Sequence, residues 1–137
     1  MKFVLLEVLR NEFVHLLSGL VVSLIVFKIT GDFNYALLTF LINLFIDVDH
    51  LFDYSLAYFK HKPTNKIYLF FHGWEWVLFF LFLLLFTKNP IFLALFMGIL
   101  NHYIVDVFTN HVKPIAYFLT YRLKRHFALE AFSQNKF

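Results

Sequence analysis

The sequence predicts an all-α membrane protein: a bundle of four transmembrane helices with both termini cytoplasmic and an amphipathic C-terminal helix. Three observations predict this fold. Of the 137 residues, 61% are apolar and only 15% are charged, too little charge to cover a soluble domain of this length. The apolar residues gather in long runs with few charges, as membrane spans require. The breaks between the runs carry residues typical of turns.

The spans follow one another within a single integral membrane domain, residues 1–137. A charged, amphipathic lead-in precedes the first span, and Gly31 supplies the turn after it. A basic loop separates the second span from the third, and Pro90 suits the first turn of the fourth helix. The chain then continues as an apolar stripe with basic neighbours, typical of a helix lying on an anionic membrane surface. The predicted spans are about 13–29, 33–52, 67–87 and 91–109, and the interfacial tail is 114–128.

Charge predicts the orientation. With four spans, the N-terminus, the middle loop and the tail share one side of the membrane. Ten of the twelve Lys and Arg residues fall there, and only Lys28 and Lys88 fall on the other side. The positive-inside rule makes the richer side cytoplasmic. The sequence therefore predicts a multi-pass protein of the cell (inner) membrane with both ends inside the cell.

Acidic and histidine residues occur within each span, always towards its cytoplasmic end. They are His15 in the first span, Asp47, Asp49 and His50 in the second, His72 and Glu75 in the third, and His102 and Asp106 in the fourth. Because successive spans run in opposite directions, all of these side chains should lie at one end of the bundle. His102 and Asp106 are four residues apart, and His72 and Glu75 are three apart, so each pair is expected to share a helix face.

A bound metal ion is the simplest counter-charge for this cluster. No Lys or Arg occurs between Phe33 and Phe59, and an unpaired carboxylate near hydrocarbon is costly. The chain has no Cys, so the ligands must be imidazole, carboxylate or amide groups. We expect a divalent metal facing the cytoplasm, zinc before manganese. One to three ions are considered and two are favoured, because acidic and histidine residues on facing helices can hold a metal pair. All eight residues named above are candidate ligands.

Simpler interpretations remain for some residues. A lone histidine near an interface, such as His15, is often solvated or caps a helix. Asp53 follows the apolar run and is either interfacial or close to the site. Asn43 is expected to hydrogen-bond to a neighbouring helix, and Gly19, Gly73 and Gly98 are expected to let helices approach closely.

The order of these motifs resembles the membrane-bound metal-dependent hydrolases of the YdjM type, which are distantly similar to zinc-dependent phospholipase C. The resemblance rests on His15-x-x-x-Gly19, Asp47-x-Asp49-His50, His72 with a nearby acid, and His102-x-x-x-Asp106. It covers roughly residues 13–110. It implies a metal-dependent hydrolase whose metal-site positions are His15, Asp47, His72, His102 and Asp106. Ile46 stands where the family often has Pro, and Glu75 could replace a further family ligand or act as a base.

The leading hypothesis is therefore a hydrolase of a phosphoester, such as a phospholipid head group entering from the inner leaflet. Metal-activated water would be the nucleophile. Glu75 is the candidate general base and Asp49 the second catalytic candidate. Lys60, Lys62 and Arg122 could attract an anionic substrate. Expected partners are membrane lipids and the phosphoester substrate. No nucleic-acid motif is present, and the sequence is compatible with a homo-oligomer.

Two other classes stay open. The same carboxylates could line the path of a metal or proton transporter or channel subunit, because intramembrane acids often mark such routes. Their clustering at one end argues against a continuous path. A bound ion could also staple the helices of a non-catalytic membrane scaffold, since the sequence does not distinguish a closed structural site from an open catalytic one.

Overall fold

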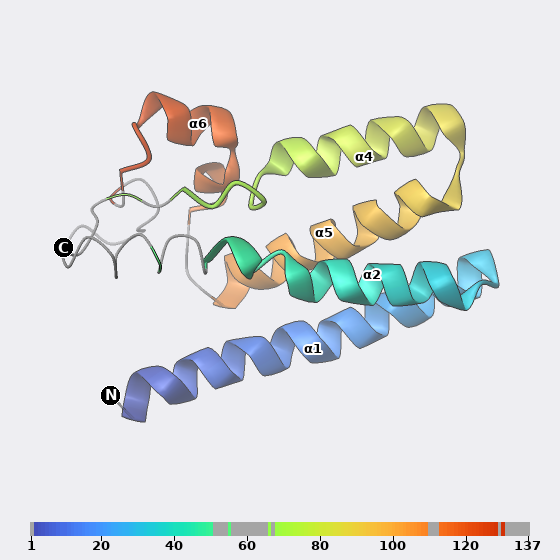
Figure 1. The fold of residues 1–137 in the computed structure, drawn as a ribbon, viewed down its shortest axis with the longest axis horizontal. Helices are drawn as coiled ribbons and strands as arrows, with labels where there is room; N and C mark the ends of the chain where they lie inside the picture. The colour runs from blue at the N-terminus through green and yellow to red at the C-terminus, as the bar shows by residue number, and fades with distance from the viewer. Residues whose placement is uncertain are drawn as a thin grey trace.

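The computed structural model describes residues 2–50, 55, 66, 68–109, 113–128 and 130 (Figure 1). Within these residues the chain is helical and forms no strand, so the all-α prediction is confirmed. A single isolated bridge pairs Lys66 with Ala128. The helices are α1 (Lys2–Thr30), α2 (Phe33–Phe45), α4 (Trp74–Thr87), α5 (Pro90–Thr109), the 3-10 helix η1 (Pro114–Tyr117) and α6 (Leu119–Lys124).

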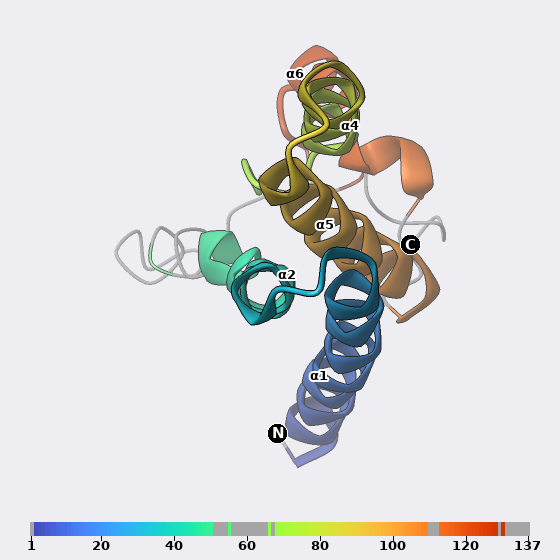
Figure 2. The ribbon, with the colours of Figure 1, turned by 90° about the vertical axis from the view of Figure 1, so that its right-hand side faces the viewer.

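Helix α5 is the centre of the packing. It contacts α1, α2 and α4, and α1 also packs along α2 (Figures 1 and 2). Two glycines allow the closest approaches. A Cβ atom on Gly98 would lie 2.8 Å from the Thr39 carbonyl oxygen, and one on Gly19 would lie 2.6 Å from Asn43 Nδ2. The expected role of these two glycines in close helix packing is confirmed. Gly73, for which the same role was expected, caps the start of α4, and a Cβ atom there would meet only side chains, the nearest being Glu75 at 3.1 Å.

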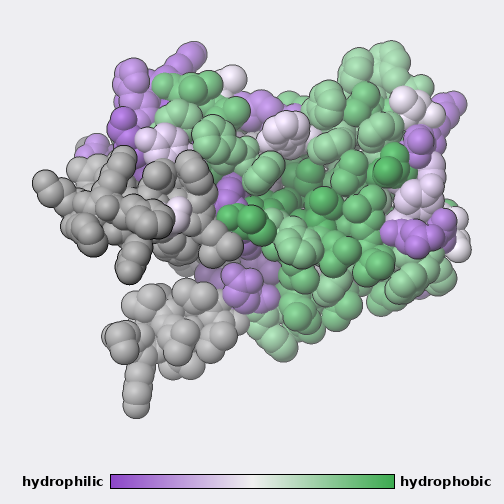
Figure 3. Space-filling model, viewed as in Figure 1, coloured by the Kyte–Doolittle hydropathy of each residue, from purple (hydrophilic) through white to green (hydrophobic). Residues whose placement is uncertain are grey.

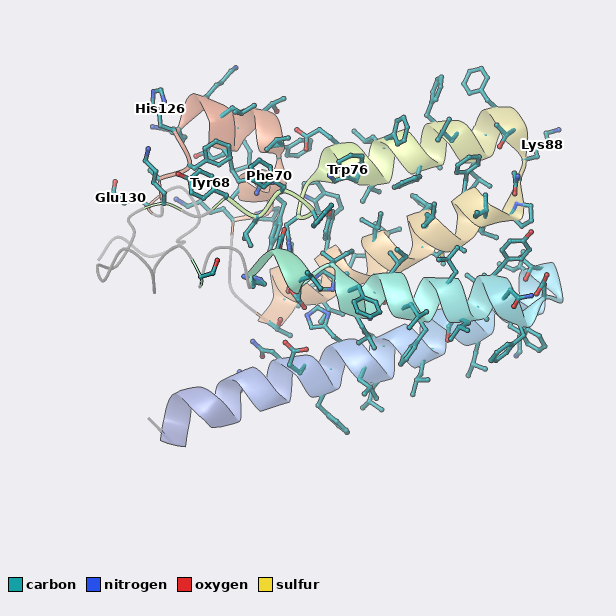
Figure 4. All side chains as sticks on the ribbon, in the orientation of Figure 1. Tyr68, Phe70, Trp76, Lys88, His126 and Glu130 are labelled. Atoms are coloured by element: carbon teal, nitrogen blue, oxygen red, sulfur yellow. The ribbon has the colours of Figure 1, made fainter. Side chains whose placement is uncertain are left out.

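The chain reverses direction between successive long helices. The α1–α2 turn and the α4–α5 turn lie together at one end of the molecule, while α6 and the start of α1 lie at the other (Figure 1). Lys88 marks the first end, whereas Tyr68 and His126 lie at the second (Figure 4). This arrangement brings the last part of α5, the end of α2 and the start of α4 towards the same end.

Two helices are long and apolar enough to cross a membrane, judged by length and composition: Arg10–Thr30 and Pro90–Thr109. Helix α4 is also apolar but has only 14 residues, and α2 has 13. Many large apolar side chains are exposed, among them Phe86 and Phe108, which a soluble surface rarely tolerates in such number. Figure 3 shows apolar residues spread over the middle of one face, with polar residues near both ends.

The second predicted span is interrupted. Helix α2 ends at Phe45, a turn follows at 46–47, and residues 48–50 are helical again. The turn is tightened by a hydrogen bond from the His50 amide to the Asp47 carbonyl, 3.0 Å long. Residues 51–52 of that span, and Asp53, lie outside the described residues. The prediction of a continuous helix over residues 33–52 is therefore wrong at this point. The break changes the direction of the side chains that follow it.

The third predicted span begins later than expected. Helix α4 starts at Trp74, and the preceding residues 68–73 form a non-helical segment. Leu69 adopts a left-handed backbone conformation with φ of 41°, which is unfavourable for a residue with a Cβ atom. His72 therefore precedes the helix, and the prediction that His72 and Glu75 share a helix face is wrong.

The tail also departs from the predicted single helix at 114–128. The chain forms η1 and then α6, with an extended residue, Phe118, between them. Arg122 of α6 is fully buried rather than turned to a membrane surface. The reason is that α6 packs on the non-helical segment 68–73 through polar contacts, described below.

Candidate metal centre

Four side chains from three parts of the chain direct one atom each to a common point. His72 Nε2 lies 3.2 Å from His102 Nε2. Asp47 Oδ1 lies 3.3 Å from the His72 nitrogen and 3.4 Å from the His102 nitrogen. Asp106 Oδ2 lies 3.4 Å and 3.5 Å from the same two nitrogens. The predicted convergence of these residues at one end of the bundle is thus realised in the structure.

These five separations match the edges of a zinc coordination tetrahedron. Nitrogen and oxygen ligands lie about 2.0–2.1 Å from zinc, and at the tetrahedral angle their mutual separation is about 3.3–3.4 Å. Two imidazoles and two carboxylates are also an ordinary ligand set for zinc or manganese. The group formed by His72, His102 and Asp106 could therefore hold a divalent ion, and Asp47 directs an oxygen to the same two histidine nitrogens.

Hydrogen bonds behind the two histidines fix which nitrogen faces the centre. His102 Nδ1 lies 2.7 Å from the Asn43 carbonyl oxygen, which can only accept, so Nδ1 carries the proton. His72 Nδ1 donates in the same way to Asp49 Oδ2, 3.0 Å away. Both Nε2 lone pairs then point at one another across 3.2 Å. A cation or a shared proton between them removes this repulsion.

Asp49 therefore lies behind His72 rather than in the donor set. Its Oδ2 also accepts from the Phe71 amide at 2.9 Å, and its Oδ1 is buried without a hydrogen-bond partner. A carboxylate that accepts the second ring proton of a metal-binding histidine orients the ring and raises its basicity. Asp47 and Asp49 contact opposite nitrogens of one imidazole, which the turn after α2 permits. In a continuous helix, residues two apart point in nearly opposite directions.

Asp106 contacts side chains on both sides of the centre. Its Oδ1 lies 3.2 Å from His15 Nε2, and the Tyr117 hydroxyl donates to Oδ2 at 3.1 Å. The His15 ring stacks on the His102 ring with centroids 4.3 Å apart. His15 is thus a neighbour of the centre, reached through Asp106. Its second nitrogen, Nδ1, is buried without a partner.

One side of the centre is open. The side chains of His72, His102 and Asp106 are at most 4% exposed, whereas those of Asp47 and His50 are 23% and 37% exposed. His50 Nε2 lies 3.3 Å from Asp47 Oδ1, the oxygen that also faces the centre. Solvent and small molecules therefore reach the centre past Asp47 and His50.

The cluster contains three overlapping groups able to hold an ion. They are His15–Asp47–His102, Asp47–His50–His72 and His72–His102–Asp106. Because the groups share Asp47, His72 and His102, they cannot each bind an ion independently. The number and identity of the ions stay predictions.

A polar layer lies beneath the cluster. Asn43 Nδ2 donates to the His15 carbonyl oxygen at 2.9 Å, and Asn101 Nδ2 donates to Asn43 Oδ1 at 2.7 Å. Asn101 also donates to Ser18 Oγ at 3.0 Å. The expected bond from Asn43 to a neighbouring helix is confirmed. These bonds tie α1, α2 and α5 together directly below the metal-ligating atoms.

Glu75 is not brought into the cluster. Its two carboxylate oxygens accept hydrogen bonds from the Leu119 amide at 2.9 Å and from the Thr120 amide at 3.0 Å. The Thr120 hydroxyl donates to it as well. Glu75 thus caps the N-terminus of α6, where backbone amides lack partners within the helix. The structure directs its carboxylate away from the position expected of a ligand or base.

Arg122 holds the segment that carries His72. Its guanidinium donates to the carbonyl oxygens of Tyr68 and His72, at 2.7 Å and 2.6 Å, and to that of Leu69. Burial lowers the pKa of Arg122 from its ordinary value. Arg122 was expected to attract substrate, because basic residues beside an apolar stripe give no sign that one of them is buried. Lys60 and Lys62 lie outside the described residues.

Tyr103 completes the support of this segment. Its hydroxyl accepts from the Gly73 amide at 2.8 Å and donates to the Phe71 carbonyl oxygen. Together with Arg122 it fixes the backbone on both sides of His72. Tyr103 was not singled out from the sequence, because an aromatic residue in an apolar span normally indicates packing.

Comparison with protein-family models, with curated proteins and with solved structures finds no match to this chain. The resemblance to the YdjM type therefore stays a prediction, and the functional argument rests on the chemistry of the centre.

Proposed function

We propose that the chain is a membrane-embedded, metal-dependent hydrolase of a phosphoester or a phospholipid head group. The observation that carries the proposal is the convergence of one atom each from His72, His102, Asp106 and the more exposed Asp47, with five of their separations between 3.2 and 3.5 Å. Catalytic zinc sites use three protein ligands and leave the fourth position to water or substrate. His72, His102 and Asp106 would supply three buried ligands beside the more exposed Asp47. The motif order of the YdjM type favours the same assignment.

In this proposal His72, His102 and Asp106 hold the ion on the buried side. The ion, when bound, would lower the pKa of a coordinated water and polarise the phosphoryl oxygens. Asp47 and His50 take the proton-accepting role first expected of Glu75. They are the exposed members, and Asp47 Oδ1 already faces both the centre and His50 Nε2. Asn43 and Asp49 keep the two ligand imidazoles in the required tautomer.

We also propose a multi-pass topology in the cell membrane with the centre facing the cytoplasm. The charge distribution favours it, because ten of the twelve basic residues fall on the side predicted to be cytoplasmic. Helices α1 and α5 are long enough to cross a membrane. Helices α2 and α4 pack beside α5, with α2 running in the same direction as α5 and α4 in the opposite direction (Figure 1). The membrane around the short helices would be thinned or the helices extended by flanking residues.

The first test is metal content. Detergent-purified protein is analysed by inductively coupled plasma mass spectrometry beside His102→Ala and the matched control His126→Ala, an exposed histidine outside the cluster. We expect stoichiometric zinc or manganese in the parent and the control, and its loss in His102→Ala. Metal-dependent hydrolysis of bis(p-nitrophenyl) phosphate is then measured on the same samples. Folded protein without metal would instead indicate a proton shared between His72 and His102 and would overturn the proposal.

A metal-stapled scaffold is the second candidate, favoured by one observation. Four protein atoms surround the centre, and closed sets of four are typical of structural zinc. Asp47→Asn separates the two functions. In the hydrolase this variant keeps its ion on the three buried ligands and loses turnover. In the scaffold the parent has no turnover, and the variant loses thermal stability.

A further inference from the structure

A groove lies between α2 and α4. Both helices pack on α5, which forms the floor between them (Figures 1 and 2). The groove has a volume of about 320 Å³, at the lower end of the range of small-molecule sites, and its lining is almost entirely apolar. Phe45 and Phe80 belong to its two walls, and Leu95 and Ile99 to its floor.

The groove has a buried base and an exposed rim. Ile46 and Ile99 at its base are 7% exposed, whereas Phe45, Phe71 and Trp76 at its rim are well exposed. The Trp76 indole donates to the Phe70 carbonyl oxygen at 3.1 Å, which fixes one side of the rim. Figure 4 places Trp76 at the start of α4 and Phe70 in the segment just before it. A bound molecule would thus be contacted from α2, α4, α5 and the segment before α4.

On two separate stretches of chain, a residue that lines the groove directly precedes a residue of the candidate metal centre. Ile46 lines the groove, and the next residue, Asp47, is the accessible member of the metal-ligating set. Phe71 lines the groove, and the next residue, His72, directs Nε2 to the centre. On both stretches the surface changes from apolar to metal-ligating within one residue. A molecule that fills the groove and reaches the centre must change from apolar to polar at the same point.

We propose that the groove binds an acyl chain of the substrate, a membrane lipid whose phosphate-bearing head lies at Asp47. This inference rests on the proposed function and narrows its substrate class from phosphoesters in general to long-chain amphiphiles. The apolar groove contributes affinity through the chain, and the metal centre acts on the head group. Because the groove lies in the apolar part of the surface, the lipid enters sideways from the membrane (Figure 3).

The experiment uses the full chain in vesicles of phosphatidylethanolamine and phosphatidylglycerol that contain a phospholipid with a diazirine near the end of one acyl chain. After irradiation, labelled residues are located by mass spectrometry. We expect labelling concentrated on Phe45, Phe80 and Leu95, several-fold above the outward-facing Leu85. Leu95→Trp fills the groove and should remove most of this labelling. Leu85→Trp, a matched substitution on an exposed face of α4, should not.

Each outcome has a separate meaning. Equal labelling of the groove and of Leu85 would indicate bulk lipid only and would overturn the inference. Cross-links between two copies through the groove would identify a second chain as its occupant and would also overturn it. Metal content and hydrolysis of bis(p-nitrophenyl) phosphate are measured on Leu95→Trp in parallel. If the parent holds metal and hydrolyses this ester but shows no groove labelling, the hydrolase stands and the acyl site does not. If metal is absent but the groove is labelled, the hydrolase fails.

Discussion

The two ligand histidines are held in contrasting ways. His102 lies on α5, an uninterrupted helix of 20 residues, and its ring is oriented by a carbonyl of the helix packed against it. His72 lies on a non-helical segment whose shape depends on Arg122, some fifty residues further along the chain. Helical hydrogen bonds within α5 position His102 and Asp106 locally. The position of His72 is the product of tertiary contacts, so the two halves of the centre should respond differently to substitution.

The largest effect is expected at the helical half. Asp106→Ala removes the carboxylate shared by His15, His72, His102 and Tyr117. We expect zinc affinity to fall by more than about 100-fold, beyond the loss typical of supporting residues, because a ligand is removed. Affinity is measured by competition with a chromophoric chelator. Asp32→Ala, a helix-capping aspartate at the opposite end, is the control and should retain the parent affinity.

The next largest effect is expected from Arg122, which holds the segment that carries His72. Arg122→Met leaves three buried carbonyl oxygens without their donor, and hydrogen bonds to charged groups contribute about 1.5–3 kcal/mol each. We expect the free energy of unfolding to fall by about 3 kcal/mol and zinc affinity to fall about tenfold through displacement of His72. Thermal unfolding in detergent, with and without zinc, measures both quantities. Arg125→Met, an exposed neighbour, is the matched control.

Arg122→Lys sharpens this comparison. Lysine keeps the charge but presents one compact ammonium in place of the planar fork that reaches three carbonyls. Partial recovery of stability with little recovery of zinc affinity would indicate that the geometry of the 68–72 segment, rather than the buried charge, positions His72. Unchanged zinc affinity in both variants would show that His72 needs no tertiary support.

The same contrast explains which features of the fold and of the centre could be predicted from the sequence. Long apolar runs and i, i+4 spacing act locally, so the helical class and the pairing of His102 with Asp106 could be predicted. The alternating chain direction then brought His15, Asp47 and His72 to the same end. The breaks at Ile46–Asp47 and before Trp74 could not be predicted in this way. They depend on contacts between distant residues, such as Arg122 with Leu69 and Asp49 with His72, which periodicity does not encode.

A smaller loss of zinc affinity is expected from substitution of Asp49, which lies behind His72. Asp49→Asn keeps the shape of the side chain but weakens the acceptor for His72 Nδ1 and for the Phe71 amide. Loss of a supporting carboxylate typically lowers metal affinity by about 10–100-fold, and the low end is expected here because the amide oxygen still accepts. Isothermal titration with zinc measures the change. A loss as large as that of Asp106→Ala would place Asp49 among the ligands instead.

The smallest effect is expected from substitution of Glu75. It distinguishes the general base expected from the sequence from the α6 cap found in the structure. Glu75→Gln retains an oxygen for the Leu119 and Thr120 amides, so the cap on α6 is weakened rather than lost. We expect stability to fall by about 1 kcal/mol, as for a helix cap, with metal content and phosphoester turnover close to the parent. Thermal unfolding and turnover are measured on the same preparation. Because a general base converted to its amide loses its proton-accepting function, abolished turnover with metal retained would restore Glu75 to the catalytic role. It would also require α6 to move away from α4 in the active state, since the carboxylate cannot cap α6 and reach the centre at once.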